Sequence, residues 1–93
     1  GIEDFLITEN SILVYPSPTE QNSMLEYSLN KEVEISIDLY DSKGRKVKSI
    51  MNNKKQEMGK HQEVIIFQDG LAQGLYFIVI SAPGEKASIK IIR

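Results

Sequence analysis

The sequence lacks cysteine and tryptophan, and it contains no long apolar run. Without cysteine the chain forms no disulfides, no thiolate metal sites and no cysteine nucleophile. No apolar stretch approaches the roughly 18 residues of a membrane-spanning helix, and residues 1–10 show no signal-peptide pattern. Because the chain begins with Gly1, we expect it to be part of a longer precursor. Packing of a β-core has to stabilise it.

Histidine is also scarce, and this limits the chemistry that the chain can perform. His61 is the single histidine and has no cysteine or paired carboxylate motif beside it, so we predict a structural role at a strand start. Glu32, Glu34 and Asp38 alternate along one strand face, whereas calcium ligands gather on a tight turn. The stretch 70–74 lacks a phosphate-loop pattern. We predict no enzyme, with no catalytic, metal or cofactor site.

Charge is unevenly distributed, although the net charge is only −2. Residues 1–30 carry acids and no base, whereas residues 43–60 carry seven bases and one acid. Nucleic-acid binding would need stacking aromatics or a binding motif beside these bases, and neither is present. We interpret the basic stretch as a solvated strand and hairpin, with contact to a polar partner as the alternative. The bases are Lys43, Arg45, Lys46, Lys48, Lys54, Lys55 and Lys60.

Apolar residues alternate with polar ones in two segments, 24–30 and 33–40, as in half-buried strands. A strand over 45–51 needs a bulge to turn both Val47 and Ile50 inward. Residues 60–68 predict a strand whose facing stays open, and 75–81 a central strand buried on both faces. Further strands are predicted at 12–15 and 87–92. Predicted core side chains are Leu25, Tyr27, Leu29, Val33, Ile35, Ile37 and Leu39, with Glu34, Ser36 and Asp38 facing water.

Turn-forming residues separate these strands. Pro16 and Pro18 end the first strand, because proline removes a backbone donor and fixes φ. Residues 41–44 predict a hairpin turn, in which the aspartate bonds its own backbone and the glycine takes positive φ. Residues 52–59 are polar and turn-like, 82–85 form another turn, and Leu71 is predicted to plug the core between Asp69-Gly70 and Gln73-Gly74.

Seven short strands, no helical stretch and turns at roughly ten-residue spacing predict an all-β fold. The expected architecture is a seven-stranded antiparallel immunoglobulin-like Greek-key β-sandwich. Residues 1–10 are expected to be a linker from an upstream protein, and 11–93 the folded domain. This architecture supports many functions, so the fold alone does not identify one.

An ordered series of short motifs allows a more specific prediction than the fold does. It comprises VYPSP at 14–18, LEYSL at 25–29, IDLYDSKGR at 37–45, GKH at 59–61, LAQGLYF at 71–77 and KIIR at 90–93. In order and spacing this series resembles the C-terminal sorting domain (type A) of proteins exported by the type IX secretion system. Ser17 departs from the YPNP form of the first motif. The stretch between Gly59 and Leu71 is longer than the family pattern by about one residue.

The resemblance implies a cargo protein, fused upstream, that an outer-membrane translocon recognises through this domain. A sortase-like signal peptidase then removes the domain, and the cargo passes from the periplasm to the cell surface or is released. The alternative is an immunoglobulin-like accessory module that binds a glycan or a neighbouring domain in a larger hydrolase or adhesin. An exposed strand edge could also pair weakly with a second copy.

The resemblance also nominates residues for recognition. We expect the last strand to matter most, because Lys90 and Arg93 place charge beside an open strand edge. Ordinary edge protection is the competing explanation for these two charges. The candidate recognition residues are Pro16, Pro18, Asp41, Gly44, Gly59, Gly74, Tyr76, Lys90, Ile91, Ile92 and Arg93.

Overall fold

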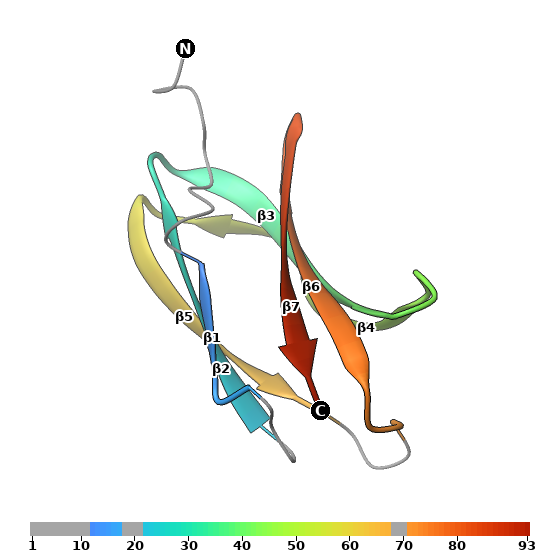
Figure 1. The fold of residues 1–93 in the computed structure, drawn as a ribbon. Coiled ribbons are helices and arrows are strands. Elements are labelled where there is room, and N and C mark those ends of the chain that lie inside the picture. The colour runs from blue at the N-terminus through green and yellow to red at the C-terminus, as the bar shows by residue number, and fades with distance from the viewer. Residues whose placement is uncertain (1–11, 18–21, 68–70) are drawn as a thin grey trace.

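The computed structural model describes residues 12–17, 22–67 and 71–93, and these form an all-β sandwich of seven strands (Figure 1). The all-β prediction is confirmed. Pro18 and the linker predicted over 1–10 lie outside the described residues. The strands are β1 (Leu13–Tyr15), β2 (Asn22–Leu29), β3 (Val33–Asp41), β4 (Lys46–Gln56), β5 (Gly59–Ile66), β6 (Leu75–Ala82) and β7 (Glu85–Ile92).

Two antiparallel sheets face each other (Figure 1). One has the order β1-β2-β5 and the other β4-β3-β6-β7, so neighbours in space are often distant in sequence. This crossover pattern is consistent with the predicted immunoglobulin-like sandwich. The fourth strand lies beside the third, whereas in the constant-type arrangement it joins the sheet of the first two.

The core lies between the sheets and consists of the alternating side chains. The inward series of β2 and β3 is confirmed, except that Val33 is only partly buried. Residues of β5 and the segment after it complete the core, and Ile65 and Phe67 face inward while Val64 and Ile66 face solvent. The buried apolar residues are Ile12, Leu25, Tyr27, Leu29, Ile35, Ile37, Leu39, Met51, Ile65, Phe67, Tyr76, Ile78, Ile80, Ala87 and Ile91.

Register shifts between β3 and β4 confirm the predicted bulge. Asp38 lies opposite Ser49 and Ile37 opposite Met51, so Ile50 is an extra residue in β4. Val47 is extra in the same way, and both side chains pack against the core. A third shift lies beside Asn53, which adopts φ 47°. These shifts let an edge strand longer than its partner follow the twist of the sheet.

The prediction of a turn over residues 52–59 is wrong, because β4 continues to Gln56. Ser36 and Asn53 connect across this half: the Asn53 N–H donates to Ser36 Oγ at 3.0 Å. An edge strand exposes both of its faces near the sheet border, so it can be built from polar residues that carry no apolar alternation. Only residues 57–58 connect β4 to β5.

The expectation that Asp38 faces water is wrong, because the residue is 8% exposed. It lies on the outer face of the central strand β3, with Val79 opposite it and the Lys46 ammonium 3.7 Å away. Neighbouring strands cover its carboxylate. Glu26 is buried on the outer face of the other sheet for the same reason, since Gln62 Nε2 donates to Glu26 Oε1 at 2.6 Å. Glu34 is exposed as expected.

Strand β6 is central, as predicted, but it is fully buried on only one face. Tyr76, Ile78 and Ile80 point into the core, whereas Phe77 and Val79 are half-buried on the outer face. No second layer covers that outer face in the described part of the chain.

Candidate functional site

Four of the sequence motifs meet at one end of the sandwich. We call this region the motif end and define it as residues 16–17, 41–45, 71–76 and 91–93. The strand register brings them together: Asp41 lies opposite Tyr76 across the β3 and β6 ladder, and Tyr76 lies opposite Ile91 across the β6 and β7 ladder. That these residues act in recognition stays a prediction. At least partly exposed at this end are Pro16, Asp41, Gly44, Gly74, Ile92 and Arg93, whereas Tyr76 and Ile91 are buried.

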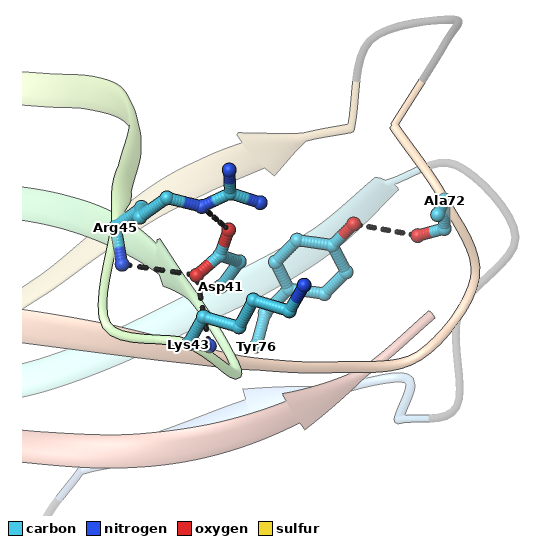
Figure 2. A network of polar contacts seen from close by, with 5 residues as sticks. All are labelled: Asp41, Lys43, Arg45, Ala72 and Tyr76. Atoms are coloured by element: carbon cyan, nitrogen blue, oxygen red, sulfur yellow. Dashed lines mark hydrogen bonds and ion pairs between the residues drawn. The ribbon is translucent and has the colours of Figure 1, made fainter.

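The turn between β3 and β4 is organised by Asp41, as Figure 2 shows. Its Oδ1 accepts hydrogen bonds from the backbone N–H groups of Lys43 and Arg45, each at 2.9 Å. Its Oδ2 pairs with Arg45 Nε, also at 2.9 Å. Gly44 closes the turn at φ 83°, a conformation that residues with a Cβ rarely adopt. The prediction of an aspartate-capped turn with a positive-φ glycine is confirmed.

The electrostatics of this turn follow from the same bonds. The backbone N–H of Arg45, its side chain and the N–H of Lys43 all stabilise the ionised carboxylate and lower the pKa of Asp41, although partial desolvation opposes them. Asp41 therefore remains charged in mildly acidic conditions and continues to hold the turn. The Lys43 side chain is exposed and lies in the same view (Figure 2).

The segment before β6 folds back onto Tyr76. The Tyr76 hydroxyl donates to the carbonyl of Ala72 at 2.6 Å (Figure 2), and its ring meets Phe67 edge to face with centroids 5.2 Å apart. Leu71 is half-buried and packs against the core, as predicted for a plug. Tyr76 is therefore a buried support for the surface of this segment.

Arg93 joins the last strand to the same segment. Its N–H and carbonyl exchange hydrogen bonds with Gly74 at 2.9 and 3.0 Å, and its Nη1 donates to the carbonyl of Leu71. Its guanidinium also lies over Phe67, 5.7 Å from the ring centroid. Arg93 is half-buried, and its guanidinium contacts the motif end; that it takes part in recognition stays a prediction.

The first motif reaches the same place through backbone and hydroxyl groups. Ser23 Oγ donates to the carbonyl of Pro16 at 2.7 Å, and the N–H of Ile92 donates to Ser17 Oγ at 3.2 Å. The serine that replaces the usual asparagine thus connects β1 to β7. Pro16 is exposed just after β1, as its role as a strand end requires.

A hollow of about 330 Å³ lies between the turn and the segment before β6, lined by residues from 41 to 47 and from 71 to 76. Its described lining holds a carboxylate and basic side chains but no histidine, and no metal-binding cluster occurs in the described ranges. The geometry fixes backbone shape, and nothing in it positions a nucleophile beside a base.

Two candidate residues lie elsewhere. Gly59 begins β5 opposite Leu29, at the other end of the sandwich, with φ 118°. Lys90 lies opposite Phe77 on the outer face of the four-stranded sheet. His61 stacks on Tyr27 with centroids 5.3 Å apart, and its Nε2 lies 2.7 Å from the carbonyl of Glu57, which agrees with a structural role.

Two surface features were missed from the sequence. One is a shallow groove of about 590 Å³ on the outer face of the four-stranded sheet, which includes Tyr40, Phe77, Val79 and Ser88. The other is the outer face of β1-β2-β5, which carries the exposed apolar side chains Leu13, Tyr15, Val64 and Ile66. The apolar run from Val64 to Phe67 contributes to the second feature, but a run of consecutive apolar residues does not reveal which side chains face outward.

Comparison with known protein families matches residues 13–93 to the secretion system C-terminal sorting domain. No curated protein matched the chain. Among the described residues, no helix has the length and apolar character needed to cross a bilayer. The matched range begins with β1 and includes all six motifs quoted above. The chain therefore belongs to the C-terminal sorting domain family of the type IX secretion system, which is not a family of enzymes.

Proposed function

We propose that the motif end is the surface through which the outer-membrane translocon recognises this domain and exports the protein fused upstream of it. The supporting observation is that segments from four separate parts of the chain converge there, held by Asp41, Gly74 and Arg93. A signal read in the folded state needs such a rigid surface, because binding then orders few further groups.

The same proposal divides the chain into a linker over residues 1–10 and a sorting domain over 11–93. Strand β1 runs toward the motif end, since Leu13 lies opposite Glu26 and Tyr15 opposite Met24. The first described strand therefore begins away from the motif end, which supports a cargo fused upstream that leaves the recognition surface uncovered. Transit through the periplasm is followed by display of the cargo on the cell surface or by its release.

Removal of the domain by a sortase-like protease is the second part of the proposal. We place cleavage within or just before residues 1–10, because a protease binds extended and accessible backbone. N-terminal sequencing of the domain recovered after export tests this site. A new N-terminus inside the β-sandwich would contradict it.

The decisive experiment fuses residues 1–93 to a periplasmic reporter with its own signal peptide in a type IX-competent strain. Surface labelling should detect the reporter, and deletion of 90–93 should leave it in the periplasm. Because Arg93 also supports the fold, a second variant, Lys43→Ala with Arg45→Ala, alters the motif end with less effect on the core. Normal export of both variants would contradict recognition through the motif end.

A further inference from the structure

The free edge of β7 has its backbone groups directed outward. Gly74 and Arg93 exchange both hydrogen bonds, and such pairs alternate along an antiparallel ladder with pairs that exchange none. The β6 and β7 register continues without a shift, so every second residue of β7 points its N–H and carbonyl away from β6. Consistent with this, the N–H of Ile92 is the group that reaches Ser17. The other outward residues are Lys86, Ser88 and Lys90.

The other three sheet edges are less suited to pairing. β1 is three residues long, and β4 contains three register shifts with Asn53 at positive φ. The end of β5 is joined to β4, because Lys48 Nζ donates to the carbonyl of Ile66 at 3.0 Å. β7 has eight residues, no proline and no bulge. β5 is equally long and regular, but the bond from Lys48 occupies the carbonyl at its end, whereas β7 presents outward backbone groups beside two exposed lysines.

The side chains on this edge indicate the charge of a partner. Lys86 and Lys90 are exposed on the outer face, four residues or about 13 Å apart, with Ser88 between them. Pairing of β7 with a second copy, centred on Ser88, would set Lys86 of one copy opposite Lys90 of the other, and like charges directly opposite destabilise a sheet. An acidic strand would place opposite charges there.

The side chains on the two faces of β7 indicate which residues the partner strand needs besides its acids. On the inner face Ile89 is only partly buried against the core, so a strand added beside β7 could cover it with apolar side chains. On the outer face Lys86 and Ser88 form one wall of the groove that contains Phe77 and Val79. The edge therefore fits a strand with acids four residues apart, apolar residues between them and a small residue in the centre.

We infer that β7 binds an extended acidic segment of the export machinery by strand addition, a mode in which backbone bonds supply affinity and side chains supply specificity. This inference rests on the proposed function and names the partner chemistry of the strand that borders the motif end. The bound segment extends the four-stranded sheet by one strand.

Direct binding is tested with the complete 93-residue chain and a fluorescent peptide, Thr-Glu-Val-Ser-Val-Glu-Thr. The matched probe replaces both glutamates with lysine. Fluorescence anisotropy should show binding of the acidic peptide and binding at least about tenfold weaker for the basic one. Equal binding, or no binding of either, would contradict the inference.

Export of the reporter tests the same edge in the cell. Ser88→Pro removes one outward N–H and leaves the bonds to β6 intact, and Ser88→Thr is its control. Lys86→Glu with Lys90→Glu reverses the charge of the β7 edge, and its control, Lys54→Glu with Lys55→Glu, makes the same change of charge on β4. Ser88→Pro and the β7 charge variant should each lower surface labelling about tenfold, while the two controls should not. Circular dichroism checks that each chain folds.

The outcomes separate the two proposals. Failure of the unsubstituted domain to export the reporter would contradict the proposed function. Normal export of Ser88→Pro and of the edge-charge variant, alongside export of the native domain, would contradict the β7 inference and leave the function standing. A dimer of the native chain that Ser88→Pro abolishes in sedimentation would replace the acidic partner with a second copy, and so would also overturn it.

Discussion

Gly74 and Arg93 form a complete hydrogen-bonded pair, with N–H to carbonyl distances of 3.0 and 2.9 Å. This pair extends the β6 and β7 ladder by one step beyond the strand bounds and fixes the segment before β6 to the last strand. The Nη1 of Arg93 then bonds the carbonyl of Leu71. One backbone pair and one side chain thus connect two of the four segments of the motif end.

Gly74→Ala should destabilise the domain although the space for a methyl group is open. Gly74 has φ 147°, which residues with a Cβ rarely adopt, and no atom lies within 4 Å of an added Cβ. The cost comes from backbone strain, at about 1–3 kcal/mol. Urea unfolding measures it, with the exposed neighbour Gln73→Ala as control. Equal stability of the two variants would show that this φ is not required.

Arg93→Ala and Lys90→Ala should differ in their effect on folding. Arg93→Ala removes the bond to Leu71 and the contact with Phe67, for an expected loss of about 1–2 kcal/mol. Lys90 is exposed on the outer face, so its loss should change stability by less than about 0.5 kcal/mol. Thermal unfolding of both variants decides this. A Lys90→Ala variant as unstable as Arg93→Ala would contradict the separate roles given to them.

The sequence predicted what depends on local period and on turn chemistry. Alternation identified the inward faces of β2 and β3 because a buried face requires a side-chain period of two. The turn at Asp41 and Gly44 was predictable because few residues bond their own backbone or adopt positive φ. The extra residues in β4 followed from the spacing of Val47 and Ile50, since both are apolar and one of them would otherwise face solvent.

Features that depend on neighbouring strands could not be predicted. The burial of Glu26 arises from Gln62 and from Lys60, whose ammonium lies 3.8 Å away, and both residues come from β5. The facing of residues 60–68 stayed open because Val64 and Ile66 are apolar and yet exposed, at 49% and 46%. Convergence of the motifs at one end required the strand order, which no local pattern contains.

Asp41→Asn should weaken the domain near neutral pH and have less effect in acid. The folded-state pKa of Asp41 lies below its ordinary value of 3.8, so ionisation favours the folded state. That contribution is present above the ordinary pKa and is lost as the pH falls through the lower folded-state pKa. We therefore expect the difference in free energy of unfolding between the native chain and the variant to be smaller at about pH 2.5 than at about pH 7, as measured by urea unfolding.

The control for this comparison is Glu32→Gln, which removes an exposed carboxylate whose partner, Lys55, lies 3.6 Å away and is also exposed. Exposed pairs contribute little to stability, so this variant should track the native chain at both pH values. If the difference in free energy of unfolding between the native chain and Asp41→Asn stays constant from neutral pH to acid, the charge of Asp41 does not stabilise the turn. The loss of stability would then come from altered hydrogen-bond geometry alone.

Tyr27→Phe should leave the domain as stable as before or make it more stable by about 1 kcal/mol. Tyr27 is fully buried, and its hydroxyl has no hydrogen-bond partner within the described residues. Burial, followed by the charge of Glu63, raises the pKa of Tyr27, so the hydroxyl stays protonated and remains a buried donor. Phenylalanine keeps the ring that stacks on His61 and removes the unpaired group.

Tyr27→Leu, which also removes the stacking ring, should destabilise the domain by at least about 1 kcal/mol. Urea unfolding at neutral pH compares the three chains, and a clear loss of stability in Tyr27→Phe would mean that the hydroxyl is bonded in solution.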